Sequence, residues 1–199
     1  MILNSKNFNN YINKNFAFEY KPTVAVAVSG GPDSMALLFL VNKWIELKNG
    51  KIIALIVNHG VRPNSKSEAN QIKAILKNKN INCKILNLNN NKVKKKNMIE
   101  ARNNRYSLLT NYCNKNHILH LFLAHHRDDN IETFLYRKIS GSNFEGLESM
   151  TKKTLRGKTN IIRPLLNFSK KNIYQFNKIN KIKFIEDPSN KNFKYTRPI

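Results

Sequence analysis

Short apolar runs alternate with longer helical stretches over most of the chain. The apolar runs, of which Thr23–Val28 is also β-branched, predict strands at Thr23–Val28, Lys51–Val57, Ile81–Leu88 and Ile118–Ala124. The longer stretches predict helices at Ser34–Leu47, which is apolar around most of its turn, and at Ser65–Lys79, Asn97–Lys115 and Asp128–Ile139. Because strands that alternate with helices favour parallel pairing, we predict an α/β fold, a doubly wound parallel sheet of about five strands with flanking helices.

The pattern weakens from about Thr151, where one further helix is predicted near Ser169–Asn180. We therefore assign residues 1–150 to the α/β domain and residues 151–199 to a short, less regular C-terminal extension that closes it. No apolar stretch approaches the roughly 20 residues of a membrane span, and the polar N-terminus lacks a secretory signal pattern, so no membrane association is expected.

The composition is strongly basic, with a formal net charge of +23. A field of that size attracts polyanions such as nucleic acid. The chain also has 27 lysines against 8 arginines, and 33 asparagines. An A/T-rich genome, such as that of an endosymbiont or an organelle, would enrich the same residues, so charge alone leaves both explanations open. Cys83 and Cys113 lack the spacing of a disulfide framework or a CxxC pair, which favours a reducing compartment, the cytoplasm or an organelle interior.

The segment SGGPDS, Ser29 to Ser34, follows the first predicted strand. Gly30 and Gly31 allow the backbone to approach an anion, and the next helix offers free N–H groups at its N-terminus. The hydroxyls of Ser29 and Ser34 add donors, while Asp33 suits an Mg²⁺ ion that neutralises bound phosphates. We therefore predict a phosphate site here. The alternative is an ordinary tight turn, and the GxxxxGK[ST] pattern of ATPase P-loops is absent.

Two basic segments follow. His59 and Arg62 come just after the second predicted strand and are candidates for nucleotide contacts, although NHG and RPN are also common turn sequences. Arg102 and Arg105 lie three residues apart on one predicted helix face. That face is either part of the site or a solvated basic surface.

The segment AHHRDDNIET follows the fourth predicted strand. Its histidines and carboxylates suggest a metal site as one interpretation. On a helix, Asp129 and Glu132 share a face, where they could hold Mg²⁺ or an ammonium group. Acidic residues in a first helical turn, Asp128 among them, are otherwise simply favourable partners of the helix dipole.

Seven segments in one order resemble a single family. SGGPDS, NHGVRPNS, ARNNRY, AHHRDDNIET, GSNFEGL, IRPLL and EDPSN together resemble the motifs of the bacterial-type tRNA(Ile)-lysidine synthetases, in the PP-loop ATP pyrophosphatase superfamily. The resemblance implies that ATP, with Mg²⁺, adenylates the wobble cytidine of tRNA(Ile) bearing a CAU anticodon. Free L-lysine then displaces AMP to give lysidine.

The resemblance also implies roles for individual residues. ATP would bind at Ser29–Ser34, which includes Pro32, together with His59 and Arg62. Asp33 would hold Mg²⁺ and be catalytic together with Asp129 and Arg105. Lysine would be bound by Arg102, Asp129 and Glu132.

The chain departs from the family pattern at several positions. Ser140 stands at a usual arginine, Asn143 at a usual glycine and Lys170 at a usual arginine. After EDPSN the sequence ends soon after Arg197, so we expect no separate C-terminal tRNA-binding domains. A minimal enzyme, a fragment and a decaying copy all fit that ending. Two other functions stay open: tRNA thiolation by a PP-loop enzyme, and RNA binding by a catalytically degenerate copy.

Overall fold

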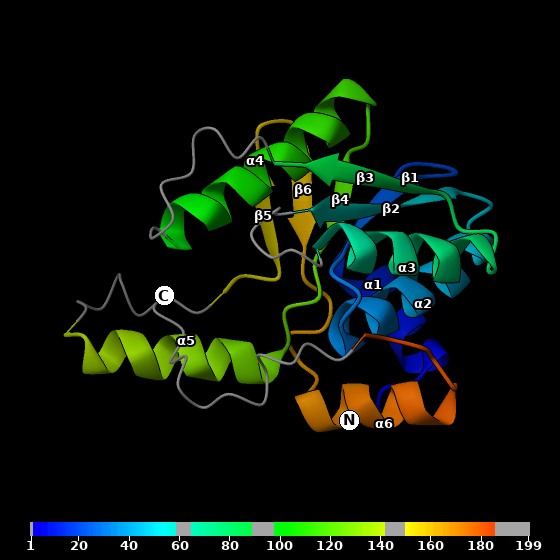
Figure 1. The fold of residues 1–199 in the computed structure, drawn as a ribbon. Helices are drawn as coiled ribbons and strands as arrows, with labels where there is room; N and C mark the ends of the chain where they lie inside the picture. The colour runs from blue at the N-terminus through cyan, green and yellow to red at the C-terminus, as the bar shows by residue number, and fades with distance from the viewer. Residues whose placement is uncertain (1, 59–64, 89–97, 142–149, 186–199) are drawn as a thin grey trace.

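A six-stranded sheet lies at the centre of the molecule (Figure 1). The computed structural model describes residues 2–58, 65–88, 98–141 and 150–185. Within them the strands lie in the order β3-β2-β1-β4-β6-β5, with bounds β1 Thr23–Val28, β2 Lys51–Asn58, β3 Cys83–Asn87, β4 His120–Phe122, β5 Lys153–Arg156 and β6 Thr159–Ile162. All neighbouring pairs are parallel except β5 and β6, which are antiparallel. The predicted doubly wound α/β fold is confirmed, with six strands where about five were expected.

The chain changes direction across the sheet at β1. It adds β2 and β3 on one side of β1 and then places β4 on the other side. In open α/β sheets, ligands bind outside the carboxyl ends of the strands at such a switch point. The register pairs Val26 of β1 with Phe122 of β4, so the segments that follow these two strands leave the sheet next to each other.

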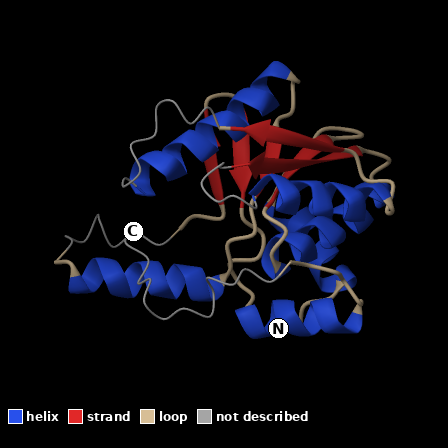
Figure 2. Cartoon of the chain, viewed as in Figure 1, coloured by secondary structure: helices blue, strands red, loops and turns tan. Residues whose placement is uncertain are grey.

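Helices cover both faces of the sheet (Figures 1 and 2). Alternate residues of β1 point to opposite faces: Val24, Val26 and Val28 join the larger core cluster, and Ala25 joins the smaller one. Helices α1, α2, α3 and α6 contribute to the larger cluster, and α4 to the smaller. Helix α5 buries none of its residues and projects at the left of Figure 1. The helix bounds are α1 Ser5–Asn15, α2 Pro32–Leu47, α3 Ser65–Lys77, α4 Met98–Lys115, α5 Arg127–Ile139 and α6 Lys170–Ile179.

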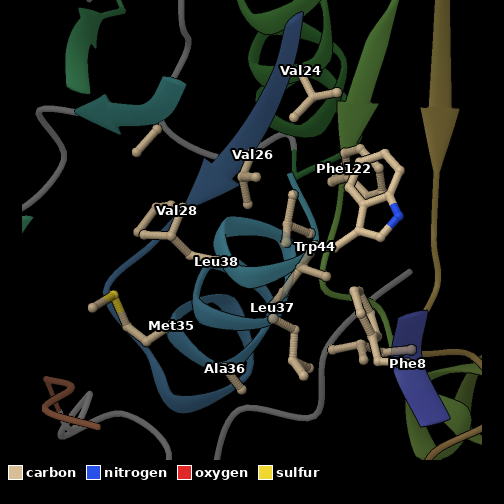
Figure 3. Packing of buried hydrophobic residues seen from close by; sticks show 14 of the residues in the cluster. Phe8, Val24, Val26, Val28, Met35, Ala36, Leu37, Leu38, Trp44 and Phe122 are labelled. Atoms are coloured by element: carbon tan, nitrogen blue, oxygen red, sulfur yellow. The ribbon is translucent and has the colours of Figure 1, made fainter. Parts of the chain in front are cut away.

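The larger core cluster is built on α2 and the aromatic residues around it (Figure 3). Trp44 is fully buried, and its ring centroid lies 6.1 Å from that of Phe122 and 4.6 Å from that of Phe18. The indole Nε1–H donates a 3.1 Å hydrogen bond to Asn13 Oδ1. This bond satisfies the one polar group that the buried Trp44 side chain carries and ties α1 to α2.

Helix α1 and the β5–β6 hairpin were not predicted from the sequence. In α1 the buried residues Phe8 and Ile12 are one turn apart. The asparagine and lysine residues around them make the apolar side of this helix difficult to recognise from the sequence. Strand β5 is a four-residue edge strand with the sequence KTLR, none of it buried. Its composition is typical of edges that resist further pairing, so it carries no apolar run.

None of the helices in the described ranges is both long and apolar enough to cross a membrane. The two cysteines are free: Cys83 is half-buried on β3, and Cys113 is buried on α4. They pack into clusters on opposite faces of the sheet. Burial raises the pKa of the Cys113 thiol to about 12, so at neutral pH this thiol is protonated and a poor nucleophile.

Gly50→Ala should destabilise the fold by about 2–4 kcal/mol, the range of severe packing clashes. A Cβ at this position would lie 2.3 Å from the backbone oxygen of Pro22, and that oxygen already accepts a hydrogen bond from Lys51 N–H at 2.8 Å. Urea denaturation measures the change. Gly141→Ala is the control, because its Cβ meets no described atom within 4 Å and only its φ of +72° is strained. Equal losses in the two variants would contradict the prediction.

Candidate functional site

The loop after β1 is shaped by its glycines. Gly30 has φ +86°, and a Cβ there would lie 2.6 Å from Ile72 Cδ1, so both backbone angle and packing require glycine. Gly31 is the N-cap of α2 and Pro32 follows at the first helical position. Met35 N–H donates to the oxygen of Gly31 at 3.1 Å, so only the amides before Met35 in the first turn lack a helical acceptor. The predicted loop and helix start are therefore present, and their binding of an anion stays a prediction.

The Ser34 hydroxyl braces this loop. Its Oγ donates to the oxygen of Gly31 at 3.0 Å and accepts from Ser29 N–H at 3.2 Å. The Oγ atoms of Ser29 and Ser34 are also 3.2 Å apart. Ser34 is buried, whereas Ser29 is exposed. Ser29 is therefore the better placed of the two to reach a bound group, and the role of both as phosphate ligands stays a prediction.

Asp33 faces His126 across the switch point. Asp33 Oδ2 lies 3.8 Å from His126 Nε2, and its Oδ1 is buried without a hydrogen-bond partner among the described residues. Burial raises the pKa of Asp33; the His126 side chain lowers it in part, and the Asp129 carboxylate raises it further. A cation bound at this carboxylate would satisfy the buried oxygen and remove the repulsion from Asp129.

The sequence suggests His126 only as a possible metal ligand, but the structure gives this residue another role. It is the N-cap of α5: its Nδ1 accepts from Asp129 N–H at 3.3 Å, and its own N–H donates to Asp129 Oδ2 at 3.0 Å. Because Nδ1 accepts, Nε2 is the protonated nitrogen of this arrangement, and it lies 3.5 Å from Asp129 Oδ2. The available signal was an acidic residue three positions after a polar residue that follows a predicted strand, the capping-box spacing.

The remaining acidic residues of α5 divide into two roles. Asp128 accepts a hydrogen bond from Lys170 N–H at the start of α6 and so joins two helix N-termini. Glu132 is exposed one turn after Asp129, on the same side of the helix, as predicted. The first-turn position of Asp128 and Asp129 also favours them electrostatically at the helix dipole. Whether Asp129 and Glu132 hold an ammonium group stays a prediction.

Arginine side chains gather around Tyr106 on α4. The Cζ atoms of Arg102, Arg105 and Arg156 lie 5.8, 5.9 and 5.3 Å from the Tyr106 ring centroid. The ring is buried, and its hydroxyl has no hydrogen-bond partner within the described residues. Arg156 comes from β5 and donates to Ser107 Oγ at 3.5 Å. No local pattern pointed to Arg156, because β5 was not predicted.

His125 interacts electrostatically with Arg163 and with Asp129. Arg163 is buried and its Nη1 donates to the oxygen of Thr151 at 3.0 Å and to Thr154 Oγ1 at 2.9 Å. Burial lowers the pKa of His125 to about 4, with a further lowering from the Arg163 guanidinium. His125 is therefore a neutral imidazole at physiological pH, and it adds no positive charge between the arginines and Asp129.

Several predicted residues lie outside the described ranges. They include the candidate nucleotide contacts His59 and Arg62, together with Asn143 and the EDPSN segment from Glu186 onward. Their roles stay predictions.

The donor set suits Mg²⁺ better than a metal held by protein alone. Within the described ranges, no group of three His, Cys, Asp or Glu residues is arranged to hold a metal ion, so these residues do not support the metal-site interpretation of AHHRDD. Mg²⁺ is typically held by one or two carboxylates, by waters and by substrate phosphates. The orphaned Oδ1 of Asp33 beside the anion-binding loop fits that pattern.

Comparisons with known proteins agree with this geometry. A model of the PP-loop domain family matches residues 4–199. The tRNA(Ile)-lysidine synthase of Wolbachia pipientis wMel is 42% identical over 196 residues, which cover 96% of this chain and 44% of that protein. The protein of the same name from Orientia tsutsugamushi (strain Boryong) is 40% identical, covering 91% and 41%. The chain thus spans less than half the length of these curated relatives.

Solved structures share the fold at low identity. The U34-tRNA thiolase NcsA from Methanococcus maripaludis superposes with a TM-score of 0.77 at 20% identity, covering 92% of this chain and 66% of that one. The NH3-dependent NAD synthetase from Campylobacter jejuni gives 0.56 at 15% identity, covering 89% and 69%. Both confirm the arrangement of sheet and helices.

The neutral His125 should make stability depend on pH. Its folded pKa of about 4 lies below the ordinary value of 6.5. Between these values the unfolded chain binds more protons, so the free energy of unfolding falls as pH drops from 6.5 to 4. In His125→Asn this drop, measured by urea denaturation at pH 7 and pH 4.5, should be smaller than in the wild type. The exposed His117 is the control: His117→Asn should keep the wild-type drop, and an equal drop in all three proteins would disprove the assignment.

Proposed function

This chain belongs to the PP-loop domain family, and on that premise we propose that it ligates lysine to C2 of the wobble cytidine of tRNA(Ile) with a CAU anticodon. ATP would be converted to AMP and diphosphate, through an adenylated cytidine, and the product would be lysidine. The observation that carries the proposal is the pair of facing carboxylates, Asp33 and Asp129, beside an anion-binding loop at the switch point. The curated relatives at 36–42% identity, all with the name tRNA(Ile)-lysidine synthase, support it.

In the first step the loop would hold the phosphates of ATP. The glycines let the backbone approach them, and the N-terminus of α2 places positive partial charge there. The cytidine O2 attacks the α-phosphorus, the bond from that phosphorus to the bridging oxygen breaks, and diphosphate leaves. Asp33 would hold Mg²⁺, which supplies neutralisation of the phosphate charge when bound.

In the second step the ε-amine of lysine attacks C2, and AMP leaves with the former O2. The amine must lose its proton before it attacks, and a carboxylate in reach accepts it. Asp129 fits this role, because the cap hydrogen bond from His126 N–H holds its Oδ2 in place. Glu132, one turn further on, would bind the lysine ammonium. Arg102 and Arg105 would neutralise the lysine carboxylate or a phosphate.

The cysteines argue against tRNA thiolation as the function. Thiolation enzymes of this superfamily that use a cysteine pair need two thiols close together, whereas Cys83 and Cys113 lie on opposite faces of the sheet. The raised pKa of Cys113, about 12, reflects its burial and leaves a protonated thiol. The second alternative is RNA binding without catalysis. The carboxylate of Asp33, whose Oδ1 is buried, opposes it, because RNA binding by itself gains nothing from an acidic group beside the loop.

The decisive experiment measures lysine transfer. The purified chain is incubated with labelled lysine, ATP, Mg²⁺ and a tRNA(Ile) transcript bearing CAU, and label on the RNA is counted. Incorporation that disappears when the wobble C is changed to U supports the proposal. Diphosphate release without incorporation indicates a different acceptor. RNA binding without either product favours the degenerate alternative. Because the relatives are bacterial, we propose that this reaction takes place in the cytoplasm.

Asp33→Ala should abolish diphosphate release and leave RNA affinity nearly unchanged. The variant removes the carboxylate next to the phosphate loop, while the basic surface that attracts RNA stays intact. Diphosphate release and filter binding of the transcript measure the two properties. Adenylation at near the wild-type rate in Asp33→Ala would refute the role given to Asp33.

Arg156→Gln should weaken binding of the transcript and reduce the slope of log K against log salt by about one, as expected for one lost phosphate contact. The reason is the position of Arg156 beside Arg102 and Arg105 around Tyr106. Lys48→Gln is a control of the same charge change. Lys48 is exposed at the end of α2, which packs on the opposite face of the sheet. Equal slopes for both variants would show that Arg156 has no specific contact.

A further inference from the structure

A buried amide from the C-terminal part of the chain holds the phosphate loop. Asn177 on α6 is 1% exposed, and its Nδ2 donates a 2.9 Å hydrogen bond to the oxygen of Pro32, 145 positions earlier. The other end of the amide, Oδ1, is buried with no partner within the described residues. Leaving a buried acceptor unsatisfied costs stability. Packing alone would therefore favour an apolar side chain at this position.

The same region makes two more contacts with the site. Ile185 N–H donates to the oxygen of Gly30 at 2.8 Å, and Lys170 N–H donates to the Asp128 carboxylate. Helix α6 also packs on α2, where the ring centroids of Phe39 and Phe176 are 6.1 Å apart. The segment from Lys170 to Ile185 therefore contacts both sides of the switch point, the loop after β1 and the start of α5.

The hydrogen bond to Pro32 acts on a particular peptide group. The oxygen of Pro32 and the N–H of Asp33 belong to the same planar unit, so fixing the oxygen fixes the direction of that N–H. A hydrogen bond accepted by the carbonyl also polarises the unit and makes its N–H a stronger donor. Asp33 N–H lies in the first turn of α2, before Met35, where an anion would bind.

We propose that Asn177 is a positioning residue for ATP: through the Pro32 oxygen, it orients the Pro32–Asp33 peptide toward the phosphates. The inference rests on the proposed function, because it requires that the loop binds ATP. Asn177 acts through Pro32 and has no contact of its own with substrate. Substitution of Asn177 should therefore weaken the binding of ATP and leave the binding of lysine and RNA unchanged.

Two variants and a matched control test this role. Asn177→Ala removes the donor and leaves space, whereas Asn177→Leu keeps roughly the volume of the side chain and carries no donor. Asn180→Ala is the control, because Asn180 Nδ2 makes a bond of the same length and kind, 2.9 Å, to the oxygen of Phe176 in its own helix. Calorimetry with ATP and Mg²⁺ gives the ATP affinity, filter binding gives the RNA affinity, and the KM for lysine comes from the incorporation assay.

Both Asn177 variants should bind ATP about tenfold more weakly, the effect of one lost hydrogen bond, with RNA affinity and the KM for lysine unchanged. Asn180→Ala should match the wild type in all three measurements. Recovery of ATP affinity in Asn177→Leu would show that a cavity, not the donor, matters, and would overturn the inference. A parallel loss of ATP, lysine and RNA binding would do the same. Failure of the wild type to bind ATP would overturn the proposed function as well.

Discussion

The position of β1 between β2 and β4 is the constraint on which the site depends. Both faces of this strand are buried, with Val24, Val26 and Val28 toward α2 and Ala25 toward α4. A shift of the register by one residue would exchange the two sets, placing valines in the smaller cluster beside α4 and alanine in the larger cluster beside α2. The register therefore fixes where β1 ends. Because β4 is held against it in parallel, it also fixes how Ser29–Gly31 and His125–His126 face each other.

Electrostatics at the switch point follow from that placement. The chain carries 35 basic residues against 12 acidic ones, yet Asp33 and Asp129 approach one histidine within 4 Å. The Asp129 carboxylate raises the pKa of Asp33, because like charges are unfavourable in a partly buried place. His126 reduces the repulsion because its Nε2 lies near both carboxylates. Its backbone N–H and ring also cap α5. The histidine thus joins helix capping to the organisation of the acidic pair.

The C-terminal part of the chain is integrated with this site. Strand β6 pairs with β4, and the buried Arg163 that follows it bonds to Thr151 and Thr154 beside His125. Helix α6 contacts the loop after β1 through Asn177. The division of the chain at residue 150 stays a prediction, but the contacts show that residues beyond it contribute to the sheet and to the site. The curated relatives are more than twice as long as this chain. Any contacts that this chain makes with a whole tRNA therefore stay proposals.

The sequence by itself determined the elements whose signals are local. Short apolar runs specified four parallel strands, and SGGPDS specified a strand end, a tight turn and a helix start, because hydrophobic period and glycine chemistry act over a few residues. Only the tertiary structure decided the roles of His126, Arg156 and Asn177. Each depends on a partner far along the chain: Asp33 for the first, Tyr106 for the second and Pro32 for the third. No local pattern encodes such distances, since they arise when the sheet brings the strand ends together and helices pack over its two faces.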